Sequence, residues 1–441
     1  MLLFVIFNKL FYPIYFMTIN HSQLLIDVQK KSNIIVNNVG DIKYLKEAIE
    51  SFDDLKIGYN TLRRLFGFLN KTKPTLSTLN TLSNYLEFTS YTNYLSNKLN
   101  FDEWYFQQRL LLIQQSNDLD EEAIQVINAG MLYDKNIVYV AYFISGLIQK
   151  NNLNTLNKVF EKIELSTVEF SKLLQFATII THSFYSIRED KALIMYSDLI
   201  KHESFKNALP LLYIDYSNLK GLYFKVLKLV EKHSLVVSDL FFVSLMGFYK
   251  QFYTEGICGN QNIKRPTGFH KYNLVLQGRF YGYKIMSVKT IDSVLKKELF
   301  KEFTINKTSW FAIEVLPALL IKEQYKILTE LSDKFYEQIF DSDKWSDETM
   351  SSIYLIALAN ISWYNDEISI AKINLELVVL EKVELSYYEY VSLFYYQTKI
   401  KISHSENDAI ANANSFLVLE KLVVKTGFIK FLEVSQKYIL N

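Results

Sequence analysis

The sequence predicts an all-α fold, with a small helix-turn-helix-like head followed by an α-solenoid of antiparallel helix pairs. Turn-forming residues are scarce, because the 441 residues include only 13 Gly and 5 Pro. Between Leu82 and Tyr253 there are one proline, Pro210, and four glycines, whereas a β-sandwich or a doubly wound sheet needs such residues at most connections. Apolar residues instead recur with a helical period in segments separated by short polar turns.

Composition limits the class of protein. The net charge is +1 and Cys258 is the single cysteine, so no intrachain disulfide and no four-cysteine zinc site can form. Cysteine usage of this kind favours the reducing cytoplasm. A nearly neutral chain argues against binding polyanions with the whole surface, but a local basic patch is compatible with it.

The first 17 residues, MLLFVIFNKLFYPIYFM, are apolar but contain Asn8, Lys9 and Pro13. Such a segment is too short and too broken to predict a membrane span, and it lacks the basic start and the cleavage site of a signal peptide. We expect residues 1–17 to be either an over-extended start, with Met17 beginning the folded protein, or a tether to a membrane surface. A membrane partner is not favoured.

The head is predicted over residues 18–100. A short helical pattern from Ser22 to Lys31 is followed by a helix with Asp41 as its N-cap. The apolar positions of this second helix are Ile42, Leu45, Ile49 and Phe52.

Residues 57–88 read IGYNTLRRLFGFLNKTKPTLSTLNTLSNYLEF. On a helix over 59–66, Leu62 and Leu65 share one face while the polar residues take the other. Gly67 ends this helix, and a further helix follows Pro74 with Thr75 or Ser77 as its cap. Between Leu55 and Leu86 there are five Lys or Arg and no Asp or Glu, a local charge suited to contact with a polyanion.

This order resembles the Cro-like helix-turn-helix of phage repressors, with Thr61-Leu62, Gly67 and the run 74–79 as the matching residues. The resemblance implies that the helix over 59–66 lies in the major groove of DNA, where arginine reads guanine and asparagine reads adenine. The turn before this helix is longer than the family's and contains Asp53 and Asp54. The DNA-binding residues that the resemblance implies are Tyr59, Asn60, Arg63 and Arg64 at the bases, and Lys71 and Lys73 near phosphates.

Helical repeats are predicted over 101–255 and 291–441. In residues 353–380, Ala359 and Ala371 flank the turn 364–366, a layout that resembles a tetratricopeptide repeat, in which small residues allow close helix packing. The period is irregular, so a generic helical bundle is the alternative. A head followed by such an array is similar in layout to peptide-sensing bacterial regulators.

Residues 256–290 interrupt the helical pattern with five glycines, Pro266 and the basic pair Lys264-Arg265. No phosphate-loop spacing is present. We expect a long loop or short hairpin between the two helical halves, or alternatively an insertion that contacts a ligand.

No catalytic chemistry is predicted. The six histidines are scattered, and neither an HExxH motif nor a nucleophile, phosphate-loop or dinucleotide signature occurs. We therefore expect no enzyme activity, no metal and no cofactor. The aromatic run around Tyr387–Tyr396 is expected to be core, and a tyrosine-lined groove for a peptide is its functional alternative.

Two hypotheses follow from these patterns. In the first, the protein is a DNA-binding transcriptional regulator whose helical array senses a signal or forms oligomers, including a homodimer. In the second, it is a protein-protein interaction scaffold that binds a protein or peptide through the array, and its head docks protein in place of DNA. The target sequence and the sensed ligand are not encoded in any pattern of these residues.

Overall fold

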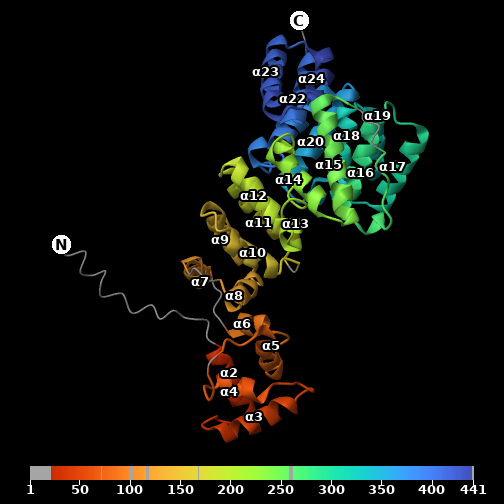
Figure 1. The fold of residues 1–441 in the computed structure, drawn as a ribbon. Helices are drawn as coiled ribbons and strands as arrows, with labels where there is room; N and C mark the ends of the chain where they lie inside the picture. Colours follow the sequence, from red (N-terminus) through yellow and green to blue (C-terminus); the bar gives the residue numbers. More distant parts are fainter. Residues whose placement is uncertain are drawn as a thin grey trace, which may run out of the picture. The chain divides into compact units, whose positions relative to one another are not determined.

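The computed structural model describes residues 21–70, 72–98, 103–115, 119–166, 168–257 and 262–439. This described part of the chain is helical and contains no strand, which confirms the all-α prediction (Figure 1). The chain divides into two compact units. Unit 1 runs to Arg188 and includes 202–208, and unit 2 comprises 189–201 and the chain from Leu209 onward, so the division lies inside the predicted stretch 101–255.

Unit 1 begins with five short helices, α2–α6, which we call the head. Their core is formed by side chains at helical spacing, among them Leu24, Val28 and Leu62, each 0% exposed. The head packs onto the following helices through α6 and α8. The helices of unit 1 are α2 (Ser22–Ser32), α3 (Val39–Glu50), α4 (Tyr59–Leu65), α5 (Leu76–Tyr85), α6 (Tyr91–Lys98), α7 (Glu103–Gln115), α8 (Glu121–Met131), α9 (Ile137–Gln149), α10 (Leu153–Lys162), α11 (Phe170–Tyr185) and α13 (Glu203–Ala208).

Unit 2 stacks its helices as a solenoid does. Helices α16, α18, α20 and α22 pack each on the next, and α19, α21 and α23 pack against α18, α20 and α22. Helix α15 also packs against α24, so helices from the beginning and end of unit 2 meet. The helices of unit 2 are α12 (Glu189–Leu199), α14 (Leu222–His233), α15 (Val237–Glu255), α16 (Leu274–Ser287), α17 (Ser293–Ile305), α18 (Ser309–Ile321), α19 (Tyr325–Phe335), α20 (Glu348–Tyr364), α21 (Ile368–Glu376), α22 (Tyr388–Ser405), α23 (Ala409–Thr426) and α24 (Lys430–Ser435).

The expected loop over 256–290 is wrong in its second half, because α16 occupies residues 274–287. Gly278 and Gly282 lie inside this helix and mark close approach of two helices, not chain reversal. A Cβ atom on Gly278 would come within 2.2 Å of the Phe311 carbonyl oxygen of α18. In the sequence, a glycine that allows two helices to approach closely looks the same as a glycine in a turn. The glycines of this segment therefore predicted a loop where the structure has a helix.

The cap predicted for the second helix of the head also needs correction. Helix α3 begins at Val39, and Asn38 is its N-cap, accepting a hydrogen bond from the Gly40 N–H. Asp41 stands at the third helical position and accepts from the Asn38 N–H, which completes a capping box. The predicted inner face is confirmed, since Ile42, Leu45 and Ile49 are fully buried.

The packing role expected for the two alanines of the repeat-like segment is confirmed. Ala359 on α20 and Ala371 on α21 are each 0% exposed, and these helices pack against each other. The aromatic run is core only in part: Tyr390 and Phe394 are 2% and 3% exposed, whereas Tyr388 is 36% exposed. Tyr387, Tyr395 and Tyr396 are partly buried. Residues 1–17, Lys71 and Cys258 lie outside the described residues. Among the helices described, none is both long and apolar enough to cross a membrane.

Candidate nucleic-acid interface

The turn between α3 and α4 determines how α4 is presented. It covers residues 51–58, and both Asp53 and Asp54 adopt left-handed backbone conformations with φ of 54°, which Asp tolerates better than most residues. Ile57 anchors the end of the turn, because its side chain is 6% exposed and its N–H donates to the Glu50 carboxylate at 3.4 Å. The long turn is therefore held against α3.

One face of α4 packs and the opposite face is open. Leu62 and Leu65 are 0% and 9% exposed, and α4 packs against α3. The helix ends where Gly67 takes φ of 80°, so the predicted stop is confirmed. Because Leu62 and Leu65 point inward, positions 60, 63 and 64 lie around the remaining helix surface.

The polar residues of α4 form a connected group. Asn60 and Arg64 are exposed, whereas Tyr59 and Arg63 are partly buried. The Arg63 Nη1 donates to Asn60 Oδ1 at 3.3 Å, and its guanidinium carbon lies 5.7 Å from the Tyr59 ring centroid. The Tyr59 hydroxyl donates to the Val39 carbonyl at 3.1 Å. The Tyr59 ring thus lies beside the Arg63 guanidinium group. Asn60 and Arg64 are the side chains most available to a partner.

No carboxylate among the described residues pairs with Arg63 or Arg64. The head as a whole is basic, since residues 21–98 contain ten Lys or Arg and seven Asp or Glu. Uncompensated guanidinium groups on an open helix face raise the local positive potential and favour an anionic partner.

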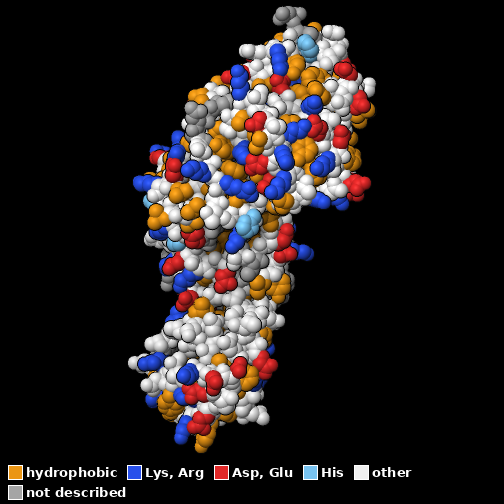
Figure 2. All heavy atoms as spheres, turned by 90° about the vertical axis from the view of Figure 1, so that its right-hand side faces the viewer, with side chains coloured by type: hydrophobic (Ala, Val, Ile, Leu, Met, Phe, Trp, Pro, Cys, Tyr) orange, Lys and Arg blue, Asp and Glu red, His pale blue; other side chains and the backbone are white. Residues whose placement is uncertain are grey.

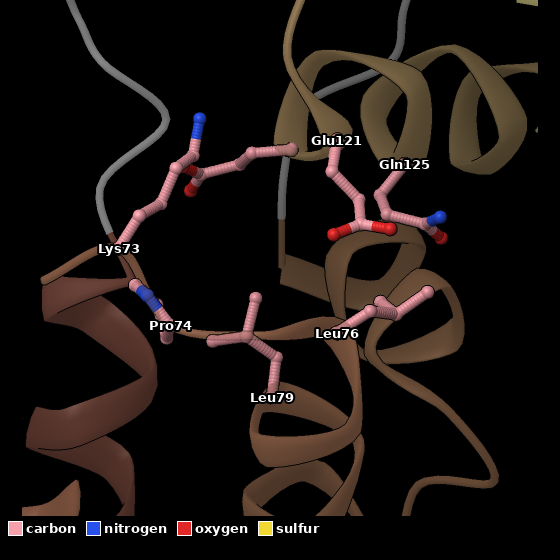
Figure 3. A pocket seen from close by; sticks show the side chains of 7 residues that line it. Lys73, Pro74, Leu76, Leu79, Glu121 and Gln125 are labelled. Atoms are coloured by element: carbon pink, nitrogen blue, oxygen red, sulfur yellow. The ribbon is translucent and has the colours of Figure 1, made fainter.

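Lys73 differs from the two arginines because it is already paired. Its Nζ lies 2.6 Å from Asp120 Oδ2 at the N-terminal end of α8, with the two side chains 53% and 40% exposed. Figure 3 shows Lys73 on the segment before α5, extending toward α8, which carries Glu121 and Gln125. An exposed pair of this kind contributes about 0.2 to 1 kcal/mol, so a stronger anion can displace it.

The same junction contains a carboxyl group with a shifted pKa. Burial raises the pKa of Glu122 to about 7, and the neighbouring Asp120 carboxylate adds to the rise. The Tyr91 hydroxyl of α6 donates to Glu122 Oε1 at 3.4 Å. Glu122 therefore lies at the contact between the head and α8 with a pKa that favours the neutral form of its carboxyl group more than in an exposed glutamate.

Unit 2 holds a buried ion pair that no sequence motif indicated. Arg279 on α16 and Glu314 on α18 are 1% and 3% exposed and are hydrogen-bonded to each other. The Tyr216 hydroxyl donates to Glu314 Oε2 at 2.7 Å and accepts from Arg279 Nε at 3.2 Å. All three groups satisfy one another inside the protein, so this cluster is a structural network with no open side for a substrate.

No group of three or more His, Cys, Asp or Glu that could hold a metal ion occurs in the described part of the chain. His182, the histidine on an apolar helix, is half-buried, and burial lowers its pKa.

Comparison of the chain with known protein families, with curated proteins and with solved structures found no match.

Proposed function

We propose that the protein is a DNA-binding regulator whose head contacts DNA through α4, with the helical units serving as a sensor or oligomerisation region. The observation that carries the proposal is the open face of α4, on which Asn60 and Arg64 are exposed and neither arginine of the helix has a carboxylate partner in the described residues. Asparagine matches the edge of adenine and arginine that of guanine in the major groove. The proposal assigns a binding role and no catalysis.

The dimensions of α4 suit this role. It has seven residues, which span roughly 10 Å, and the major groove is about 12 Å wide. Its C-terminal neighbour α5 begins at Leu76 and is capped by Thr75, whose hydroxyl accepts from the Thr78 N–H at 3.3 Å. A short helix held between two capped helices presents its side chains without an ordering cost.

Direct binding of the full-length chain to DNA tests the proposal. A pool of random duplexes is selected on the protein at low salt, and the enriched sequences are titrated with the wild type and with Arg63→Ala/Arg64→Ala. Loss of two phosphate or base contacts is expected to weaken binding at least tenfold and to reduce the slope of log K against log salt by up to about 2. Lys372→Ala/Lys382→Ala removes two lysines of unit 2 that pair with Glu406 and Glu348 and serves as the matched control.

The proposal fails if the wild type does not bind duplex DNA at low salt, or if the arginine variant binds as well as the control variant. Circular dichroism melting of each variant confirms that the head remains folded.

A protein-protein scaffold is the second candidate function, favoured by the outer face of α23. Ile410, Leu417 and Val424 are 77%, 54% and 84% exposed and recur every seven residues, which is the spacing of a helix-helix contact. Leu417→Asp should abolish recovery of a stoichiometric protein partner, or self-association seen by light scattering, with nuclease present. Equal recovery with the variant contradicts this function.

A further inference from the structure

Positive charge is concentrated in one segment of unit 2. Residues 262–307 contain ten Lys or Arg and three Asp or Glu, in a chain whose net charge is +1. The segment comprises the loop before α16, α16 itself, and α17. The rest of the protein therefore has a net negative charge, and this asymmetry is larger than that of the head.

Each of the three acidic residues of the segment either pairs with a basic side chain or caps a helix. Glu298 pairs with Lys284 and accepts from the Tyr281 hydroxyl at 3.0 Å. Glu302 lies 3.5 Å from Arg265. Asp292 caps α17 by accepting from the Leu295 N–H at 2.8 Å. None of these carboxylates pairs with the lysines that remain.

Six lysines are left without a carboxylate partner among the described residues, and all six are exposed. They are Lys264, Lys271, Lys289, Lys297, Lys301 and Lys307. We call the last four, which lie on α17 or within four residues of its ends, the α17 surface. Lys297 and Lys301 are four residues apart and so lie on one face of α17. Figure 2 looks onto the side of unit 2 that carries α17, and Lys and Arg side chains gather near the middle of that face with some Asp and Glu among them.

From this arrangement we infer that the α17 surface binds the phosphate backbone of duplex nucleic acid without reading its sequence. Lysine ammonium groups on a helix and its flanking loops neutralise phosphates and release counterions. The large apolar side chains exposed in this segment are Val294 and Ile305, and neither is aromatic. The rings of this segment that are not buried are His270, which is exposed, and Tyr272 and Phe300, which are partly buried. The choice of a duplex over a single strand therefore rests on the proposed function, in which the head contacts duplex DNA.

The choice of nucleic acid over other polyanions rests on the proposed function of the head, but the charges of the α17 surface stand independently of it. The experiment uses the full chain and a fluorescent duplex of random sequence, titrated over a range of salt concentrations. Lys289→Gln/Lys297→Gln/Lys301→Gln removes three charges, and Lys372→Gln/Lys382→Gln is the matched control. The triple variant should bind at least tenfold more weakly at low salt, with a slope of log K against log salt smaller by up to about 3.

The Arg63→Ala/Arg64→Ala variant separates this inference from the proposed function. If the triple variant loses affinity for the random duplex while the arginine variant does not, the α17 surface is supported. The role of the head is then decided separately, by whether the arginine variant loses affinity for the enriched sequences. Equal binding by the triple and control variants overturns the inference and leaves the head untouched. Binding of the full chain to vesicles containing phosphatidylserine is measured as well. If the chain binds the vesicles but not the duplex, the inference is overturned, because the partner of the α17 surface is then a membrane surface.

Discussion

Replacement of Lys401 by methionine should remove most of the pH dependence of stability that unit 2 shows between pH 7 and pH 9.5. Lys401 lies on α22 and is 1% exposed. Its Nζ lies 2.5 Å from the Tyr325 hydroxyl and 3.1 Å from Asn360 Oδ1. The rings of Tyr325, Trp363 and Tyr438 surround it with centroids at 4.9, 5.7 and 5.8 Å. The ammonium is thus buried among dipoles and rings, without a carboxylate in direct contact.

Burial lowers the pKa of Lys401 from 10.5 to about 7; nearby Lys437 lowers it further, whereas Glu323 opposes the shift. In the unfolded chain this lysine keeps its proton up to about pH 10.5, so between pH 7 and pH 10 the unfolded state binds more protons than the folded state. The free energy of unfolding therefore rises with pH over this window. The full shift corresponds to about 5 kcal/mol, of which about 3 kcal/mol develops between pH 7 and pH 9.5.

Urea unfolding followed by tryptophan fluorescence measures the effect, because Trp363 lies beside Lys401. Wild type, Lys401→Met and Lys399→Met are compared at a series of pH values. Lys399 is exposed on the same helix, so its replacement changes the net charge equally but leaves the buried site intact. Burial raises the pKa of Tyr325 and acts in the opposite sense above pH 10, which is why the series stops at pH 9.5.

The wild type and Lys399→Met should gain stability as the pH rises, and Lys401→Met should show a gain smaller by about 3 kcal/mol. The constant cost of leaving the Tyr325 and Asn360 partners unpaired cancels in this comparison across pH. Three parallel curves would refute the reasoning, because they would mean that Lys401 enters the fold with its ordinary pKa.

The buried polar network, the packed glycines and the head junction yield three further predictions. Arg279→Met leaves Glu314 buried without its partner and should destabilise unit 2 by about 3 to 5 kcal/mol, and Arg279→Met/Glu314→Gln should restore part of the loss in urea unfolding; no recovery would contradict the pairing. Gly278→Ala places a Cβ 2.2 Å from the Phe311 carbonyl oxygen, whereas one on Gly247 meets nothing within 4 Å, so the melting temperature should fall for Gly278→Ala and stay or rise for Gly247→Ala. Asp120→Asn keeps a good cap on α8 but frees Lys73, so duplex affinity should rise a few-fold, and it should not rise when Lys73→Met is already present; a rise in both backgrounds would show that Lys73 is not the group released.

The head was predictable because its information is local. The helical spacing of Leu62 and Leu65, the left-handed Gly67 and the Thr75 cap act within one or two turns of the chain, and each is found where the sequence predicted it. For the expected DNA-contacting residues, the helical periodicity predicted only part of what the structure shows. Periodicity placed Arg63 and Arg64 on the polar face of the helix. It could not indicate that the Arg63 side chain is partly buried beside the Tyr59 ring while Arg64 is exposed.

The sequence by itself determined the all-α class, the approximate positions of several helices of the head and the concentration of charge, since these depend on residue type and on neighbours within a few positions. Only the tertiary structure decided which charges are paired and which are buried. Lys73 meets Asp120 and Lys401 meets Tyr325 across 47 and 76 residues of chain. Interactions at such separations depend on how helices pack, and neither propensity nor periodicity carries that information.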